Sequence, residues 1–315
     1  MRVLNLAIWI GVAILNAQTS PLWHEQKTKN YLPDMTWPEV QDLLTRTDMV
    51  ILPVTSLEQH GPQLPIGTDY FTGIEEAKLI AQRTDVLVAP ILFPGLSPYH
   101  MEFPGTIALS PDTIQRVYFE AAQSLISQGI RRFLLLNSHI GNQVVTRYIM
   151  DRINQETPAI AVELNDAAAP FLPKSSSKET KFDRHAGVGE TSAGLYLFPT
   201  LVDMSKAGPN SLELPEHLRN MLPEVIARDP TTSTVFLAES LKPKVTGKRT
   251  STREMTATGV WSERDTRDAS ALQGRAQAEA FVSAAVQFIE RWKVLRPMQP
   301  LSERQAKVSK QDDGR

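Results

Sequence analysis

Three side chains of types that bind metal ions lie close together between Glu58 and Asp69. Glu58 and His60 follow the apolar run Met49–Val54, which is typical of a strand covered on both faces. Their E-x-H spacing in an extended loop directs both side chains to the same side, so both can reach one ion. Asp69 can join them or simply cap the next helix. Imidazole and carboxylate groups bind Zn, Mn or Fe, and the stretch therefore predicts a metal site.

Two later segments supply further candidate ligands. His139 follows the apolar run from Phe133 to Leu136, and Glu190 lies shortly after His185. Together with the first three side chains, they provide about the number of ligands that two closely spaced cations need, with one carboxylate bridging. Glu190 has a second interpretation, as a first-turn carboxylate favoured by the helix dipole.

Other catalytic classes lack their motifs. The chain has no G-x-S-x-G elbow, no G-x-x-x-x-G-K-[ST] loop and no H-E-x-x-H helix. It has no cysteine, which excludes thiolate ligands, a cysteine nucleophile and disulfides. Nothing marks the nucleophile of a serine triad. Of the other histidines, we expect His100 to support the site from outside the ligand set and His217 to lie at the surface.

The composition is that of an ordinary globular protein. Of 315 residues, 42% are apolar and 22% are charged, so the chain can bury a substantial core. The formal net charge is -2 and the pI is near 6.3. Such a chain has no basic field to hold a phosphate backbone, and we expect no nucleic-acid partner.

Residues 1–17 have the pattern of a signal peptide. Met1-Arg2 is a positive start, the stretch from Val3 to Leu15 is an apolar core, and Asn16-Ala17-Gln18 is a small-residue cleavage region. The core is shorter than the roughly 20 residues that span a bilayer. We expect export to the periplasm or the exterior, without stable membrane insertion after cleavage. An uncleaved anchor or a buried N-terminal strand is the alternative.

Apolar runs alternate with helical patterns through the first half of the chain. This alternation predicts an α/β fold with a parallel or mostly parallel sheet between layers of helices. Function in such sheets gathers where strands end, and three of the four candidate motifs follow predicted strands. The predicted strands are 49–54, 86–93, 133–136 and 160–164, with helices between them at about 36–46, 69–84, 111–128 and 143–155.

The second half of the chain is less regular. Residues 202–256 are rich in Pro, Lys, Thr and Ser, with weak strand signals and no clear order of elements. A long amphipathic helix is predicted over 268–292, and a flexible polar tail over 294–315. We find no repeat and no second hydrophobic core. We therefore expect a linker at 18–33 and one catalytic domain at 34–293.

Four sequence blocks together resemble the creatininase family of metal-dependent amidohydrolases. The stretch from Leu52 to Asp69 is similar to that family's LPVGS-x-E-x-HGPHLP-x-x-TD block, and Phe103–Thr106 to its FPGT block. Asn137–Asn142 resembles the NGHGGN block, and His185–Ser192 resembles the HAG-x-x-ETS block. The blocks follow the family's order and rough spacing over about residues 34–291, which is far more specific than any single motif.

The resemblance implies a three-layer α/β/α sandwich and a site for two divalent ions such as Zn, Mn or Fe. It also implies hydrolysis of a non-peptide or unusual amide C–N bond in a small molecule. Glu190 matches a carboxylate that binds or supports the metals, and His185 matches a catalytic His that passes a proton to the leaving nitrogen. Family members often form homo-oligomers, and we expect one here. The matching metal ligands are Glu58, His60, Asp69 and His139, with Asp69 as the bridge.

The chain departs from the family pattern at several positions. Gln63 replaces the second His of the first block. Ser138 and Ile140 replace glycines of the third block and are expected to narrow the pocket floor. Family members that act on creatinine carry Glu at the position of Gly141 and Trp around the substrate, whereas residues 143–184 contain no Trp. Creatinine is therefore not the expected substrate.

The sequence thus predicts an exported amidohydrolase with two divalent metal ions, acting on a small amide, lactam or formamide-like compound. Two alternatives stay open. One is a peptide-trimming hydrolase of the same fold, and the other is a non-catalytic metal-binding scaffold whose altered glycines close the pocket. The late segment 259–264 departs from the family's G-V-x-G-D-P, which predicts an altered far wall of the site.

Overall fold

The N-terminal part of the described chain packs against the domain. In this segment Ser20 N donates a hydrogen bond to Tyr196 O at 2.7 Å, and Tyr31 forms an isolated parallel bridge with Val88. The expected linker at 18–33 is therefore wrong from residue 19 onward. The predicted signal peptide lies outside the described residues and stays a prediction. The computed structural model describes residues 19–92, 95–174, 180–240 and 252–312.

Within these ranges, four parallel strands form the central sheet. The order is β2-β1-β3-β4, and each pairing is parallel, as predicted. The second strand is shorter than the predicted 86–93, because Pro90 has no N–H to donate to a ladder. The bounds are Met49–Val54 for β1, Leu87–Val88 for β2, Arg132–Asn137 for β3 and Ile160–Glu163 for β4.

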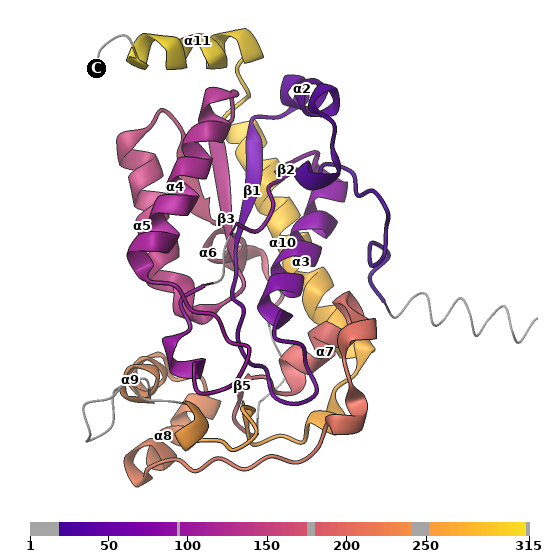
Figure 1. Ribbon diagram of the computed structural model, residues 1–315, viewed down its shortest axis with the longest axis vertical. Helices are drawn as coiled ribbons and strands as arrows, with labels where there is room; N and C mark the ends of the chain where they lie inside the picture. The colour runs from indigo at the N-terminus through magenta and orange to yellow at the C-terminus, as the bar shows by residue number, and fades with distance from the viewer. Residues whose placement is uncertain (1–18, 93–94, 175–179, 241–251, 313–315) are drawn as a thin grey trace, which may run out of the picture.

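Helices cover both faces of this sheet (Figure 1). Residues of β1 alternate between the two faces: Met49 and Ile51 pack in one hydrophobic cluster, and Val50 and Leu52 in the other. The predicted three-layer α/β/α sandwich is confirmed. The first cluster contains residues of α3 (Thr68–Thr84), α6 (Leu164–Ala168), α7 (Val188–Leu197) and α10 (Ala271–Leu295). The second contains residues of α2 (Trp37–Arg46), α4 (Pro111–Ser127) and α5 (Gln143–Glu156).

A smaller group of elements lies beyond the carboxyl ends of the strands, at the bottom of Figure 1. The weak strand signals over 202–256 are misleading, because α8 buries Leu218, Leu222 and Val225 at helical spacing. These side chains form a hydrophobic cluster separate from those beside the sheet, so the expectation of a single core is also wrong. The group comprises α8 (Glu216–Ile226), α9 (Pro230–Ser240) and the antiparallel pair β5 (Asp183–His185) and β6 (Trp261–Ser262).

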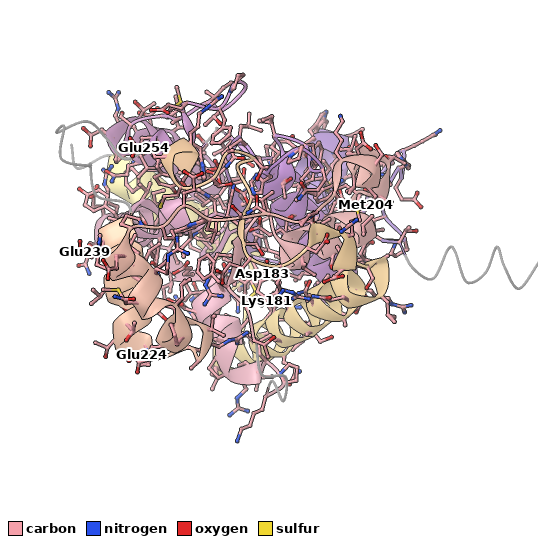
Figure 2. The ribbon with its side chains drawn as sticks, turned by 90° about the horizontal axis from the view of Figure 1, so that it is seen from below. Lys181, Asp183, Met204, Glu224, Glu239 and Glu254 are labelled. Atoms are coloured by element: carbon pink, nitrogen blue, oxygen red, sulfur yellow. The ribbon has the colours of Figure 1, made fainter. Side chains whose placement is uncertain are left out.

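Figure 2 views this end of the molecule, with Glu224 of α8 and Glu239 of α9 on one side and Asp183 near the centre. Among the described residues, no helix combines the length and the apolar content needed to cross a membrane. Short 3-10 turns lie at Leu32–Asp34, Pro98–His100, Ile140–Asn142, Ala169–Phe171, Pro199–Leu201, Met204–Lys206, Thr252–Glu254 and Thr266–Asp268.

The described part of the expected flexible tail contains a helix, which corrects that expectation. After α10 the chain turns into α11 at Leu301–Asp312. Arg304 of α11 is fully buried and donates hydrogen bonds to Leu44 O and Gly129 O, in the last turn of α2 and just after α4. These bonds satisfy carbonyl groups that the ends of helices leave free. The polar composition of the tail therefore conceals a helix fastened by one buried side chain.

Gly274 of α10 lies against the backbone of α7. A Cβ atom at this position would lie 1.8 Å from Ser192 O, so any larger residue must separate the two helices. We expect Gly274→Ala to lower the free energy of unfolding by about 2 kcal/mol. Thermal denaturation measures this change, with Gly208→Ala as the control because a Cβ at Gly208 meets nothing within 4 Å. Equal stability of the two variants would contradict the prediction.

Candidate metal centre

The candidate site lies at the carboxyl end of the sheet, between β1 and β3. The order of the strands reverses here, since β2 lies on one side of β1, and β3 and β4 lie on the other. A reversal of this kind leaves a crevice beyond the strand ends, where ligands bind in open α/β sheets. Glu58 and His60 follow β1, and His139 follows β3. The topology therefore brings together side chains that lie far apart in the sequence.

A hydrogen bond from a second motif holds the loop after β1. Gln59 N donates to Thr106 Oγ1 at 3.1 Å. Thr106 is the last residue of the Phe103–Thr106 block, so this block supports the loop that carries the candidate ligands. Glu58 and His60 are each only 1% exposed. Polar groups buried to this degree require partners.

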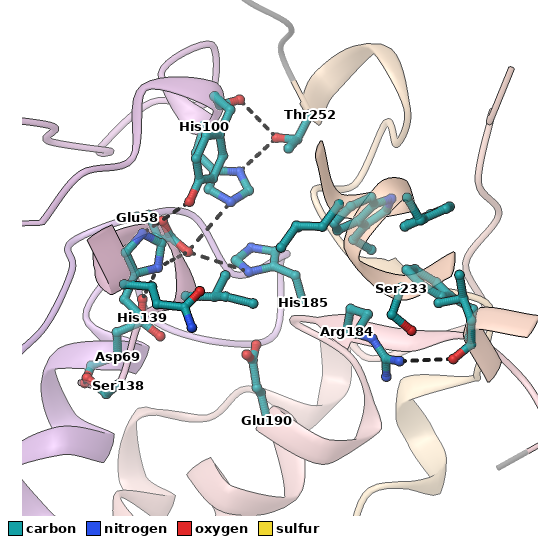
Figure 3. A pocket seen from close by; sticks show the side chains of 18 of the residues that line it. Glu58, Asp69, His100, Ser138, His139, Arg184, His185, Glu190, Ser233 and Thr252 are labelled. Atoms are coloured by element: carbon teal, nitrogen blue, oxygen red, sulfur yellow. Dashed lines mark hydrogen bonds and ion pairs between the residues drawn. The ribbon is translucent and has the colours of Figure 1, made fainter. Parts of the chain in front are cut away.

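Asp69, labelled beside His139 in Figure 3, faces two sets of side chains with its two oxygen atoms. Its Oδ1 lies 3.3 Å from His60 Nε2, and the same nitrogen lies 3.6 Å from Glu190 Oε2. Its Oδ2 lies 3.2 Å from His139 Nδ1, which in turn lies 3.3 Å from Glu58 Oε1. All the ligands predicted from the sequence thus converge, with the Asp69 carboxylate between two imidazole–carboxylate pairs.

Asp69 and Glu190 each have a second interpretation, Asp69 as a helix cap and Glu190 as a first-turn carboxylate. Asp69 is in the first turn of α3, but the N-cap is Gly67 and no side chain caps this helix. Glu190 is in the first turn of α7, and its Oε2 accepts a hydrogen bond from Ala186 N at 2.6 Å. Glu190 therefore interacts with the start of its helix and with the cluster at once.

His185 ends β5 and lies beside the cluster in Figure 3. Its Nε2 is 2.7 Å from Gln59 O, and only an N–H can donate to a carbonyl, so we assign the proton to Nε2. Its Nδ1 is 3.5 Å from Glu58 Oε1. This tautomer leaves Nδ1 as the basic nitrogen that faces the cluster.

Burial and neighbouring charges set the protonation states of the cluster. Burial opposes a charge on His60 and His139, but nearby carboxylates outweigh it, raising the pKa of His60 to about 10 and that of His139 well above its usual value. Burial also opposes the charge on Glu58, but the imidazoles around it hold its pKa well below the usual range. Burial lowers the pKa of His185 and raises that of Glu190 to about 7. The carboxylates of the cluster therefore favour positive charge at the positions of His60 and His139.

The donor set fits divalent cations. His60 Nε2 and Asp69 Oδ2 are buried and make no hydrogen bond within the described part of the chain, although each faces an oppositely charged group. Buried polar atoms left in this state call for an additional partner such as an ion. One candidate donor atom from each of Glu58, His60 and Asp69 lies within 4.8 Å of the others, and the same holds for His60, His185 and Glu190. Nitrogen and oxygen donors suit Zn, Mn or Fe.

His100 lies closer to the cluster than the sequence indicates. Its Nε2 is 3.6 Å from Glu58 Oε1, and its ring stacks on that of His185 with centroids 4.4 Å apart. Burial lowers the pKa of His100 to about 4, so its ring is neutral at ordinary pH. Its loop follows the predicted strand 86–93, and His100 was expected to support the site from outside the ligand set. His217, by contrast, is exposed as predicted.

Gln59 has a positioning role that the sequence analysis does not single out. Its Nε2 lies 3.0 Å from His100 Nδ1 and donates to Gly259 O at 3.0 Å. The amide thus links His100 to the late segment 259–264, while Gln59 O accepts from His185 Nε2. The feature of the sequence that could have identified Gln59 is its position between the candidate ligands Glu58 and His60.

The departures from the family pattern have structural explanations. Gln63 Nε2 donates to Ala186 O at 2.7 Å, so this side chain ties the first block to the fourth. Ser138 Oγ donates to Asp69 O at 2.8 Å and lines the cavity, as expected. Ile140 also lines the cavity, although 64% of its area is exposed.

Gly141 stands where family members that act on creatinine carry Glu, and Tyr99 fills the vacated space. A Cβ on Gly141 would lie 2.2 Å from Tyr99 Oη and 2.3 Å from His139 Nε2. We expect Gly141→Ala to displace His139 and to reduce both bound metal and turnover about 10-fold or more. Elemental analysis and an activity assay measure the two effects. Wild-type metal content in this variant would contradict the prediction.

A cavity of about 440 Å³ opens beside the cluster. Glu58, Asp69 and Glu190 line it near the candidate ligands, while aromatic side chains line it farther away. Segment 259–264, which was predicted to alter the far wall, contributes the aromatic side chain of Trp261 to the lining of the cavity. The cavity leaves room for a substrate next to the cluster.

A model of the creatininase family, described as creatinine amidohydrolase, matches residues 33–289. The chain therefore belongs to the creatininase family, as its sequence motifs predict.

Three relatives in this family have different substrates. A 3-dehydro-scyllo-inosose hydrolase of Thermotoga maritima is 32% identical over 183 residues, covering 56% of this chain and 58% of that protein. A mycofactocin precursor peptide peptidase of Mycolicibacterium smegmatis is 29% identical over 217 residues, covering 64% of this chain and 82% of that protein. A creatinine amidohydrolase of Pseudomonas putida is 27% identical over 197 residues, covering 56% and 75%. The chain thus spans little more than half the length of the first of these relatives.

Solved creatininase structures share the fold. A crystal structure of creatinine amidohydrolase (creatininase) superposes with a TM-score of 0.63 at 20% identity, covering 85% of this chain and 98% of that one. A creatininase variant described as Zn-Zn type gives a TM-score of 0.62 at 22% identity, covering 85% and 98%. A creatininase described with Mn gives 0.59 at 21% identity, covering 85% and 99%. At this identity the likeness supports the fold alone.

Proposed function

We propose that this chain hydrolyses the C–N bond of an amide or lactam, using two divalent cations that share the Asp69 carboxylate. The observation that carries the proposal is the arrangement around Asp69, whose Oδ1 and Oδ2 face separate imidazoles at 3.3 Å and 3.2 Å. A carboxylate with a ligand pair at each oxygen is suited to bridge two ions. His139 and Glu58 would complete one ion site, and His60 and Glu190 the other.

The metals and the side chains divide the chemistry between them. When bound, two such cations lower the pKa of a water molecule toward neutrality and polarise the amide oxygen. The pKa of His185 lies below its usual value, so its Nδ1 is unprotonated at neutral pH and can accept a proton. Glu58 Oε1, 3.5 Å away, then stabilises the resulting imidazolium. From this position His185 can deliver the proton to the leaving nitrogen.

The cavity favours an enzyme over a non-catalytic scaffold. A scaffold whose altered glycines had closed the pocket would leave no space beside the cluster, whereas a cavity of about 440 Å³ lies there. A peptide-trimming hydrolase is the second candidate, because one relative is named a mycofactocin precursor peptide peptidase. Export of the chain and its assembly into a homo-oligomer also stay predictions.

An amide screen tests the proposed function. Protein reconstituted with Zn or Mn is incubated with a panel of primary amides, lactams, N-formyl compounds and short peptides, and released amine is measured. The matched control is His139→Ala, which removes the imidazole between Glu58 and Asp69. We expect turnover by the wild type and none by the variant. Retained turnover in His139→Ala would refute the ligand assignment, and preferential release from the peptides would favour the second candidate.

A further inference from the structure

The far end of the cavity has a different character from the end that holds the candidate ligands. Carboxylates and imidazoles gather at one end, whereas Phe182, Phe236 and Trp261 line the other. In Figure 3, Arg184 and Ser233 lie on the opposite side of His185 from Glu58. A substrate with its amide at the cluster would therefore extend past His185 toward these aromatic rings.

The aromatic rings support one another. Phe236 and Trp261 stack with centroids 5.8 Å apart and planes at 23°, and Phe182 meets Trp261 edge-on at 5.5 Å. Pairs in these geometries are favourable beyond the apolar area they bury. All three side chains belong to the hydrophobic cluster under α8 and α9. They form a preorganised apolar surface rather than loose side chains that would have to be ordered on binding.

One cationic side chain, Arg184, lies near this surface. Arg184 directs its guanidinium at backbone carbonyl groups, donating to Asp183 O at 3.1 Å and Val225 O at 3.3 Å. Besides Phe236, α9 contributes Ser233, Thr234 and Leu237 to the lining. The far end therefore presents apolar surface with hydroxyl groups and one guanidinium, and sites for organic ligands are commonly lined by apolar side chains with a few polar groups.

The size of the cavity also favours a substrate that is larger than an unsubstituted amide. A water molecule occupies about 30 Å³ in the liquid, so an unsubstituted amide the size of a few waters leaves most of the space vacant. The volume of about 440 Å³ lies within the range of pockets that enclose larger organic ligands. We infer that Phe182, Phe236 and Trp261 bind an aromatic or branched apolar substituent of the substrate, which makes the substrate a hydrophobically substituted amide. This inference rests on the proposed function for the position of the amide.

A matched pair of amides tests the inference. Acetamide and phenylacetamide carry the same primary amide and differ in the phenyl group. Dissociation constants are measured by ligand-observed NMR with metal-free protein, where no turnover interferes, and kcat/KM is measured with the Zn-loaded protein. Burying the phenyl group should lower the dissociation constant about 10-fold or more relative to acetamide.

Two variants on α9 locate the subsite. Ser233→Trp fills the far end and should weaken phenylacetamide binding about 10-fold while changing acetamide binding less than about 2-fold. Val235→Trp places the same side chain on a position of α9 that is 42% exposed and should change neither affinity. Equal binding of the two amides by the wild type, or unchanged phenylacetamide binding in Ser233→Trp, would overturn the inference. Preferential binding of phenylacetamide without hydrolysis of either amide would support the subsite and count against the proposed function instead.

Discussion

Asp69→Asn is expected to lose most of its bound metal and to lower kcat/KM for amide hydrolysis by about 1,000-fold or more, since metal ions contribute several kcal/mol to such reactions. The change keeps the shape of the side chain but removes its charge. Both imidazoles that face this carboxylate, His60 and His139, would lose their shared partner. The effect should therefore exceed that of removing a ligand from one ion site alone. Elemental analysis and steady-state kinetics measure it.

Glu75→Gln is the matched control for this variant. Glu75 is a buried carboxyl group on the same helix, 2.8 Å from Lys78, and it takes no part in the cluster. Burial raises the pKa of Glu75, so the loss of its charge should be well tolerated. We expect wild-type metal content in Glu75→Gln. Equal metal content in the Asp69 and Glu75 variants would show that Asp69 does not bind the ions.

Arg304→Ala is expected to lower the free energy of unfolding by about 3 kcal/mol, because hydrogen bonds from a charged group to buried acceptors are among the stronger ones. The guanidinium donates to Leu44 O and Gly129 O, and its loss leaves both carbonyl groups without this donor in the interior. Arg131 in turn donates to Arg304 O, so the contacts of α11 depend on one another. The melting temperature should fall by about 6 °C.

Two comparisons separate the role of Arg304 from a general effect of altering the helix. Glu303→Ala changes the neighbouring exposed residue of α11 and should leave the melting temperature within about 1 °C of the wild type. Arg304→Lys keeps the charge but not the forked geometry, and should restore only part of the stability. A wild-type melting temperature in Arg304→Ala would mean that α11 is not held by this side chain.

The parallel sheet was predictable from the sequence, and the candidate ligands lie together in the structure, while their binding of metal stays a prediction. Each candidate ligand lies beside a recognisable local signal: Glu58 and His60 follow the apolar run of β1, and His139 follows that of β3. Because parallel strands deliver their carboxyl ends to one edge, the motifs had to converge there. This convergence could be predicted without knowing how individual side chains pack.

Features that depend on contacts distant in sequence were beyond the sequence analysis. Arg304 looks like a surface residue of a polar tail until its acceptors, one in α2 and one just after α4, are known. Tyr99 and Gly141 are unremarkable separately, and only their proximity explains why no side chain fits at Gly141. The aromatic surface around Trp261 is likewise assembled from segments far apart in the chain.

The central claim is a pair of divalent cations held around Asp69, and the metal content of the purified protein tests it most directly. The full chain is reconstituted with Zn or Mn, freed of excess metal, and examined by inductively coupled plasma mass spectrometry against protein concentration. The arrangement of Glu58, His60, Asp69, His139 and Glu190 predicts about two equivalents per chain. Less than one equivalent after reconstitution would contradict the claim.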